Sequence, residues 1–194
     1  MKISIITPVF NAVQTLEQTI LSVLNQKTES EIEYIIIDGG STDGSLEIIN
    51  QYLEGISFFI TEPDKGVYDA MNKGIQEATG DIIGIINSDD WYNDGALAAV
   101  EKLFLHDSSL EIVYSPIDNY LDGDYFNTFI PGDLDNLVFK FTINHPSCFI
   151  KRTVYEKIGN FDLEFSIAAD YDFILRAYLA KTKFHCLNFP LASY

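Results

Sequence analysis

The sequence predicts an α/β domain built around a mostly parallel β-sheet, and three observations support this prediction. First, short runs such as "YIIID" and "IIGII" are apolar at successive positions, so both faces of each strand must be covered. Second, each run is followed by a cluster of polar residues and then by apolar residues at helical spacing. Third, this order repeats four times in the first half of the chain, as it does in consecutive βα units.

The first half is therefore expected to contain four strands and four helices. The strands are predicted at residues 3–7, 34–38, 57–61 and 82–86. The helices that follow are identified by their apolar stripes, which are Val13, Leu16, Ile20 and Leu24; Leu46, Ile49 and Leu53; Tyr68, Met71 and Ile75; and Leu97, Val100, Leu103 and Phe104. Asn11 and Gln14 have the spacing of a capping box, which predicts that the first helix begins at Asn11.

The second half breaks this rhythm and predicts a smaller antiparallel element. Residues 111–131 are typical of short strands joined by Asp-Gly turns. Further strands are expected at 143–150 and 183–189, and further helices at 153–159 and 168–180. Because no linker or low-complexity segment divides the chain, a single domain is expected over residues 1–194.

Composition limits the partners of the chain. With 29 acidic and 12 basic residues the formal net charge is −17, and no cluster of Lys and Arg could bind a nucleic-acid backbone. Nucleic acid is therefore not expected as a partner, and a phosphorylated ligand would need a cation or a helix N-terminus to offset the repulsion. No apolar run reaches membrane-spanning length, and the two cysteines lack C-x-x-C spacing. We expect a cytoplasmic protein with free, buried thiols.

Polar residues follow the predicted parallel strands at the point where each strand ends. Right-handed crossovers bring these carboxyl ends to one edge of the sheet, where ligands of open α/β sheets bind. The residues that should meet in a cleft at this edge are Asn11, Asp38, Asp43, Asp64 and Asp89.

The pair Asp89-Asp90 is the most informative feature of this edge. Two adjacent carboxylates at a strand end need a proton or a divalent cation to relieve their repulsion. Mg²⁺ or Mn²⁺ suits such oxygen ligands and keeps coordination sites for substrate phosphates. The alternative is a solvated turn in which Asp90 or Asn93 caps the next helix, but the other polar residues at the edge favour the metal site.

Four other segments carry candidates with structural alternatives. Asp38 precedes "GGSTDGS", where two glycines allow a ligand close to the backbone, although a tight turn capped by Asp43 or Ser45 explains the same pattern. In the third helix a solvated face accounts for any one of the polar residues Asp69, Asn72 and Lys73.

The third of these segments is "AADYDFILRA". Asp170 and Asp172 would lie in its first turn, where the helix dipole favours a carboxylate, but either could also serve a cleft as a general base. His145, in "NHPSCFI", could orient an acceptor or contact a phosphate, and a structural role is the more common alternative for a histidine in such an apolar setting.

With these residues in view, the chain resembles family 2 glycosyltransferases of the GT-A fold. The segments that match the successive blocks of that family, in order, are "SIITPVFNA", "IIIDGGSTDGS", "DKGVYDAMNKGI", "GDIIGIINSDDW", "NHPSCFI" and "FDLEFSIAADYDFILRA". They span residues 3 to 177. "YDAMNKG" together with "AADYD" further resembles bacterial enzymes that build capsules, colanic-acid-like polymers or lipopolysaccharide.

The resemblance implies roles for individual residues. Thr7, Pro8 and Phe10 would wrap the nucleotide base, and Asp38 would hydrogen-bond it. Asp69, Asn72 and Lys73 would line the pyrophosphate and sugar side of the donor pocket. Asp89 would bind the metal, with Asp90 and Asn87 beside it, and Asp170 would be the catalytic base. His145 completes the substrate-binding candidates.

Three departures from the family pattern qualify these roles. Asn87 replaces the first Asp of the D-x-D motif, and Ala169 replaces the Glu of the Glu-Asp block. The Q-x-x-R-W block of processive synthases is absent, which implies one sugar per encounter. Because many relatives continue further, the resemblance also implies a C-terminally truncated acceptor half.

The implied function is metal-dependent, inverting transfer of a sugar, with Mg²⁺ or Mn²⁺ as cofactor. The donor would be a nucleotide-diphosphate sugar, and a UDP-sugar is the first expectation. The acceptor would be a saccharide or a lipid-linked molecule, with peripheral association at the inner face of the membrane. Residues 1–95 would form the nucleotide-sugar half and 96–194 the acceptor half. One alternative is a sugar-nucleotide-binding or scaffold domain with impaired catalysis. The other is a nucleotidyltransferase, which would need a Gly-rich loop with Lys or Arg after the first strand, and the sequence has no such loop there.

Overall fold

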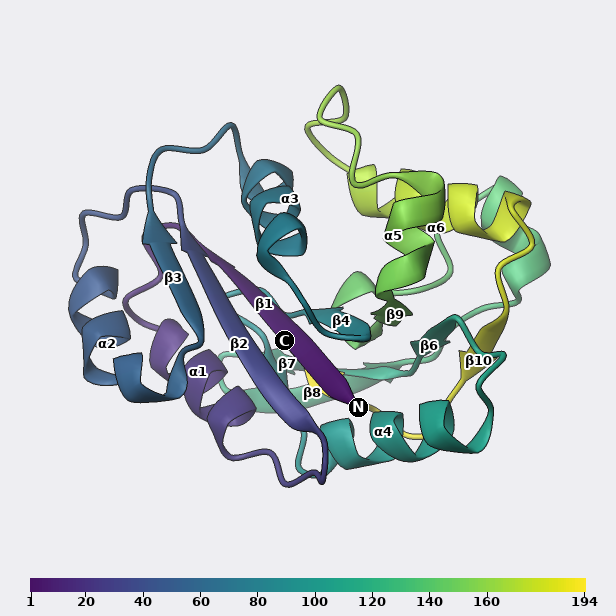
Figure 1. The fold of residues 1–194 in the computed structure, drawn as a ribbon, viewed down its shortest axis with the longest axis horizontal. Coiled ribbons are helices and arrows are strands. Elements are labelled where there is room, and N and C mark those ends of the chain that lie inside the picture. Colours follow the sequence, from purple (N-terminus) through teal and green to yellow (C-terminus); the bar gives the residue numbers. More distant parts are fainter.

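The computed structural model describes residues 1–194 and contains a seven-stranded central sheet, drawn in Figure 1. The strand order is β10-β6-β9-β4-β1-β2-β3. The strands are β1 (Lys2–Val9), β2 (Glu31–Asp38), β3 (Phe58–Thr61), β4 (Ile82–Ile85), β6 (Ile112–Tyr114), β9 (Phe149–Lys151) and β10 (Phe184–Cys186). Strands β4, β1, β2 and β3 pair in parallel, β10 is parallel to β6, and only β9 runs antiparallel to its neighbours. The mostly parallel sheet predicted from the sequence is confirmed.

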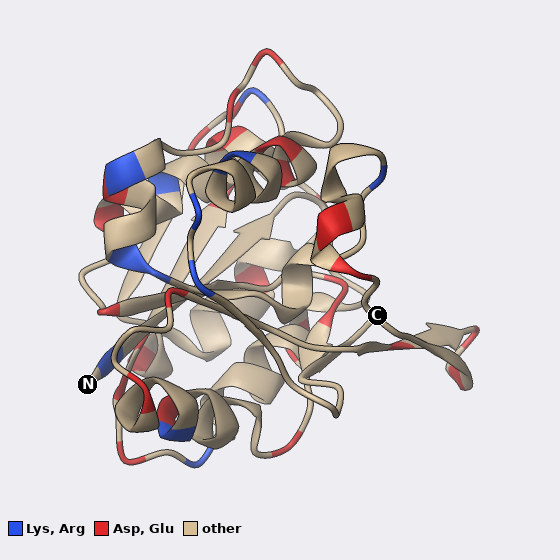
Figure 2. Ribbon diagram, turned by 90° about the vertical axis from the view of Figure 1, so that its right-hand side faces the viewer, with Lys and Arg blue, Asp and Glu red and all other residues tan.

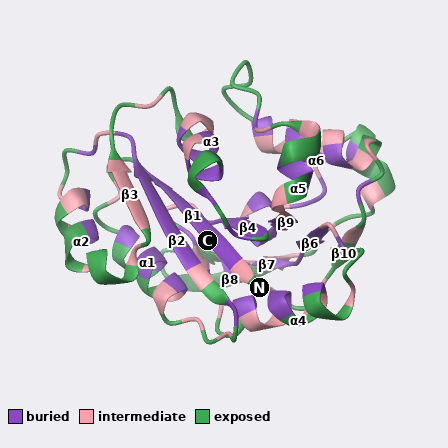
Figure 3. Cartoon of the chain, in the orientation of Figure 1, coloured by how far each residue is buried: buried purple, intermediate pink, exposed green.

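Helices cover both faces of this sheet, and the pleat of the strands explains why. Successive side chains of a strand point to opposite faces, and Ile5 and Ile6 of β1 accordingly belong to two different core clusters. One face packs against α1 (Leu16–Leu24), α2 (Ser45–Gln51) and α4 (Ala96–His106). The other packs against α3 (Val67–Glu77), α5 (Arg152–Ile158) and α6 (Ala169–Leu179). Figure 3 shows the buried residues gathered along the sheet and on the inner sides of these helices.

Short elements complete the fold. Three 3₁₀ turns are η1 (Leu53–Gly55), η2 (Leu134–Val138) and η3 (His145–Ser147). A second sheet has the order β5-β11-β7-β8, formed by β5 (Trp91–Tyr92), β11 (Ala192–Ser193), β7 (Ile117–Leu121) and β8 (Asp124–Phe129). Figure 2 shows a hairpin projecting from the body beside the C-terminus. The hairpin β7–β8 turns at Asp122-Gly123, both with positive φ, as the Asp-Gly pattern predicted.

Several predicted boundaries and one predicted cap are wrong. Helix α1 begins at Leu16, because Asn11 Oδ1 accepts a hydrogen bond from Thr42 N at 2.9 Å and does not cap the helix. The strand expected over 143–150 starts only at Phe149, since η3 contains Pro146, which has no N–H to donate to a ladder. Both cysteines are free as expected, but Cys186 is exposed. No helix has both the length and the apolar character that crossing a bilayer requires.

A buried carboxylate ties the strands that lead to the edge of the sheet. Glu33 on β2 accepts hydrogen bonds from Ser4 Oγ at 2.5 Å and from Thr79 N at 2.7 Å, and it pairs with Lys2 Nζ at 2.7 Å. Burial opposes ionisation, but the bonds from Lys2, Ser4 and Thr79 outweigh it and lower the pKa of Glu33 to about 2. Glu33 thus joins β1, β2 and the connection between α3 and β4.

We predict that Glu33→Gln lowers stability in a pH-dependent way. The folded-state pKa of Glu33 lies below its ordinary value of 4.5, so its contribution is complete above that value and is lost as the pH falls toward 2. The variant should lose about 1–3 kcal/mol at pH 7, and its stability should depend less on pH between 4.5 and 2. Denaturant unfolding at a series of pH values measures both effects.

Glu31→Gln is the matched control, because Glu31 is 69% exposed and pairs with the same Lys2 at 3.3 Å. Its effect should stay within about 0.5 kcal/mol. Equal stability of the two variants at pH 7 would contradict the role given to Glu33.

Candidate active site

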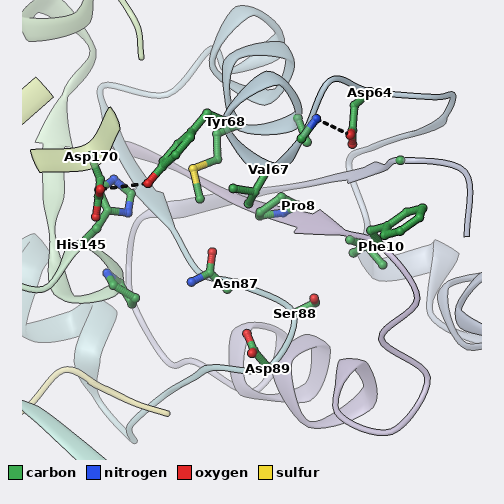
Figure 4. A pocket seen from close by; sticks show the side chains of 16 residues that line it. Pro8, Phe10, Asp64, Val67, Tyr68, Asn87, Ser88, Asp89, His145 and Asp170 are labelled. Carbon is green, nitrogen blue, oxygen red and sulfur yellow. Dashed lines mark hydrogen bonds between the residues drawn. The ribbon is translucent and has the colours of Figure 1, made fainter. Parts of the chain in front are cut away.

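A cavity of about 830 Å³ lies at the carboxyl ends of β1 and β4, where the topology predicts a ligand site. This volume lies within the range of small-molecule sites. Figure 4 shows the side chains of the sixteen residues that line it. They are Pro8, Val9, Phe10, Gly39, Asp64, Gly66, Val67, Tyr68, Ala70, Met71, Asn87, Ser88, Asp89, His145, Pro146 and Asp170.

The lining of this cavity contains acidic side chains without a lysine or arginine to balance them. Three carboxylates, Asp64, Asp89 and Asp170, line the cavity, and the lining contains no Lys or Arg. The predicted cation Lys73 lies elsewhere, where its Nζ pairs with Glu62 at 2.8 Å and donates to the carbonyl of Pro63 at 3.2 Å. An anionic ligand in this cavity therefore finds no lysine or arginine side chain.

The first end of the cavity is formed by Phe10, Gly39 and Asp64. Asp38, directly before Gly39, is fully buried behind this wall. Its Oδ2 accepts from Gly40 N and Ser41 N at 3.0 Å each, and from Thr61 Oγ1 at 2.6 Å. Its Oδ1 is buried without a partner. An unpaired buried acceptor is costly, so this corner has unused capacity for a donor group.

Two residues predicted at this edge hold loops together instead of lining the cavity. Asn11 bonds to the β2–α2 loop through Thr42. Asp43 accepts from Val13 N at 3.0 Å and from Ser45 Oγ at 2.6 Å, and the bond from Ser45 is the main cause that lowers the pKa of Asp43. Both therefore fasten the segment after β1 to the segment after β2.

The adjacent carboxylates of Asp89 and Asp90 lie in different environments. Asp90 is 5% exposed and accepts from Asn87 Nδ2 at 2.8 Å. Burial, together with the neighbouring charge of Asp89, raises the pKa of Asp90 to about 7. Asp89 is exposed, lines the cavity and receives no hydrogen bond from the protein. The repulsion expected from the sequence is thus relieved in part by protonation of Asp90, which leaves Asp89 as the free ligand.

These residues fit a divalent cation that is shared with a substrate. No group of three His, Cys, Asp or Glu side chains forms a closed metal site in the protein. Mg²⁺, however, is commonly held by one or two carboxylates and by substrate phosphates. Asp89, together with the unpaired amide oxygen of Asn87 in the same lining, provides that kind of partial site.

The second end of the cavity is formed by Asp170, Tyr68 and His145. Asp170, in the first turn of α6, accepts a hydrogen bond from the Tyr68 hydroxyl at 2.9 Å. Burial, with the charge of Asp170, raises the pKa of Tyr68 to about 12. Figure 4 shows the His145 ring beside the Asp170 carboxylate. His145 is 5% exposed and its Nε2 has no partner, and burial lowers its pKa, against the charge of Asp170.

The second acid of the same helical turn is used differently. Asp172 Oδ2 pairs with Arg176 at 2.8 Å and does not line the cavity. Asp170 is therefore the acid of this turn that is available to a ligand.

Half of the predicted site residues line the cavity and half do not. Those in the lining are Pro8, Phe10, Asn87, Asp89, His145 and Asp170. Thr7, Asp38, Asp69, Asn72, Lys73 and Asp90 are not part of it. Thr7 is fully buried against the Tyr34 hydroxyl at 3.1 Å, and Asp69 accepts from Lys65 N at 3.0 Å. Asn72 is buried and uses both ends of its amide on the backbone of Phe161.

Sequence reasoning missed Tyr68 and Met71 as lining residues. Both belong to the apolar stripe of α3, which helical spacing assigns to the core. Tyr68 is half-buried, so its ring packs while its hydroxyl reaches the site. The hydroxyl group of Tyr68, at a position where helical spacing expects an apolar side chain, is the sequence signal that could have indicated a role in the site.

Comparisons with known proteins agree with this arrangement. The family model described as Glycosyl transferase family 2 matches residues 4–159. An uncharacterized glycosyltransferase of Mycobacterium tuberculosis is 37% identical over 180 residues, which cover 91% of this chain and 69% of the relative. A PGL/p-HBAD biosynthesis glycosyltransferase of Mycobacterium bovis is 33% identical over 183 residues, which cover 90% of this chain and 69% of the relative.

Two solved structures share the fold. S. aureus TarS 1–349 in complex with UDP-GlcNAc has a TM-score of 0.84 at 19% identity, over 100% of this chain and 58% of that chain. The mannosyltransferase PcManGT from Pyrobaculum calidifontis, in complex with GDP-Man and Mn²⁺, has a TM-score of 0.76 at 18% identity, over 99% of this chain and 56% of that chain. This chain thus spans less than two thirds of either protein, and both have the GT-A fold expected from the sequence. Since the family match covers most of its length, the chain belongs to glycosyl transferase family 2.

Proposed function

We propose that this chain transfers one sugar at a time from a nucleotide-diphosphate sugar, a UDP-sugar in the first instance, to a hydroxyl group of a saccharide or lipid-linked acceptor. The transfer is metal-dependent and inverts the anomeric configuration, and it serves the synthesis of bacterial surface polysaccharide or glycolipid. The observation that carries the proposal is one cavity that contains a free carboxylate, Asp89, and a second carboxylate, Asp170, but no Lys or Arg.

The end of the cavity at Phe10 and Gly39, with Asp38 buried directly behind it, suits the nucleotide base. The exposed ring of Phe10 offers a surface for stacking, and Gly39 allows close approach of a ligand to the backbone. The unpaired Oδ1 of Asp38 suits a ring N–H of a base such as uracil. The TarS complex contains UDP-GlcNAc, which supports a UDP-sugar as the first donor to test.

The middle of the cavity suits the diphosphate. Because no Lys or Arg lines it, the negative charge of a donor requires a cation. Asp89, with the amide oxygen of Asn87, would hold Mg²⁺ or Mn²⁺, which supplies charge stabilisation to the departing nucleotide diphosphate. The PcManGT complex contains GDP-Man with Mn²⁺, which supports the same choice of metal.

The far end suits the acceptor. Asp170 takes the proton from the acceptor hydroxyl as that oxygen attacks the anomeric carbon from the face opposite the leaving group. His145 is held neutral by its burial, and its unpaired Nε2 can bind a sugar hydroxyl. Glycolipid acceptors are supported by the relative named for PGL/p-HBAD biosynthesis.

We predict that Asp170→Asn lowers the rate of donor turnover by about 10²–10⁴-fold, the usual contribution of a general base. Its affinity for UDP-GlcNAc with Mn²⁺, measured by calorimetry, should stay unchanged. The matched control is Asp172→Asn, which removes the same charge from the same helical turn outside the cavity. Undiminished turnover by Asp170→Asn would exclude Asp170 as the base.

We predict that Asp89→Asn removes the effect of metal on donor binding. Calorimetry with UDP-GlcNAc should show a Mn²⁺-dependent affinity in the wild type, and a loss of at least about 10–100-fold in the variant, the range found when groups behind a metal ligand are removed. EDTA should bring the wild type to the level of the variant. Asp94→Asn, at an exposed position outside the cavity, serves as the control.

Equal donor affinity of wild type and Asp89→Asn in Mn²⁺ would contradict the metal site. Screening UDP-, GDP- and dTDP-sugars by thermal shift with Mn²⁺ selects the donor, and product anomers identified by NMR test inversion. Tight donor binding without any turnover would favour a binding domain over an enzyme.

A further inference from the structure

The carboxylate of Asp170 is held by one hydrogen bond from the opposite half of the chain. The hydroxyl of Tyr68, on α3, donates to Asp170 Oδ1 at 2.9 Å, although the two residues are 102 positions apart. No other protein group donates a hydrogen bond to this carboxylate. Oδ1 is therefore occupied, and Oδ2 is the oxygen left for an acceptor hydroxyl.

The Tyr68 side chain is itself held firmly. Its ring packs against Phe161 with the centroids 5.6 Å apart. One turn further along α3, Asn72 donates to the carbonyl of Phe161 at 2.9 Å and accepts from its N–H at 3.0 Å. Tyr68 and Asn72 thus clamp the same segment, so that the phenol is presented to Asp170 from a fixed position.

No charged side chain near Asp170 could hold its carboxylate in place of Tyr68. The other titratable groups that face it are His145 and Cys148. Burial lowers the pKa of His145 and raises the pKa of Cys148, so both side chains are uncharged near neutral pH. Asp170 also follows Ala168, whose φ is +69°, after the exposed stretch 162–168. The segment that leads into α6 therefore offers no side chain to hold the carboxylate.

We propose that Tyr68 is a positioning residue, which fixes the Asp170 carboxylate in the orientation needed to take a proton from the acceptor. This inference rests on the proposed role of Asp170 as base. In the step, Asp170 Oδ2 takes the acceptor proton while the acceptor oxygen bonds to the anomeric carbon. The bond from that carbon to the diphosphate breaks, and its electron pair leaves with the nucleotide. Tyr68 keeps its proton throughout, as its raised pKa allows.

The test removes only the hydroxyl, with Tyr68→Phe, and follows release of UDP from UDP-GlcNAc in Mn²⁺ with water as the acceptor. At saturating donor, turnover should fall by about 10–100-fold, the effect of misplacing a catalytic group by about 1 Å. Donor affinity from calorimetry should be unchanged. Tyr171→Phe is the matched control, because Tyr171 lies next to Asp170 and donates to the carbonyl of Leu137 at 2.5 Å, away from the base. It should stay within about twofold of the wild type, since it leaves the geometry of the base intact.

A double-mutant cycle distinguishes a positioning role of Tyr68 from a role in stability alone. If Tyr68 acts through Asp170, Tyr68→Phe should cause no further loss in the Asp170→Asn background. Losses that multiply in the double variant, or wild-type turnover of Tyr68→Phe beside an impaired Asp170→Asn, would overturn the positioning role and leave the proposed function intact. Wild-type turnover of Asp170→Asn would instead overturn the base assignment itself.

Crystal structures of the wild type and Tyr68→Phe test the same claim without turnover. The wild-type carboxylate should lie within hydrogen-bond distance of the Tyr68 hydroxyl. In the variant it should move or lose its order while Phe161 stays in place. A carboxylate that keeps its position in Tyr68→Phe would overturn the inference.

Discussion

The organising constraint of this molecule is electrostatic: two adjacent carboxylates end a buried strand in a chain of net charge −17. They cannot both be charged in that place without a counter-ion. The fold separates them, because Asp90 is buried in the protein, where its pKa rises to about 7, while Asp89 is exposed at the cavity wall. No Lys or Arg joins it there. In the function we propose, a cation that arrives with a diphosphate would complete the site and make the acidity of the chain compatible with an anionic donor.

The second feature of the site is the set of contacts that joins the first half of the chain to the second half. Helix α3 belongs to the βα units of the first half, yet its side chains Tyr68 and Asn72 reach residues of the second half. Tyr68 bonds to Asp170, and Asn72 bonds to the backbone of Phe161. One helix thus lines the cavity and contacts the second half of the chain.

Much of the fold could be predicted from the sequence because the apolar runs are long and the βα rhythm is regular. The strands β1 to β4 and the cavity at their carboxyl ends follow from that pattern. Elements of two or three residues, such as β5 and η3, leave too short a pattern to detect. The side-chain roles were harder to predict, because a polar residue on a helix gives no sign of whether it faces a ligand or a neighbouring backbone. Asn72 was expected at the donor and instead clamps Phe161, and Tyr68 was expected in the core and instead reaches the site.

The most direct test of this account is anomalous diffraction at the manganese edge from crystals soaked with Mn²⁺ and UDP-GlcNAc. The account predicts an anomalous peak within about 2.0–2.2 Å of an Asp89 carboxylate oxygen and of diphosphate oxygens, as for a six-coordinate divalent cation. Bound nucleotide with no manganese peak beside Asp89 would contradict it.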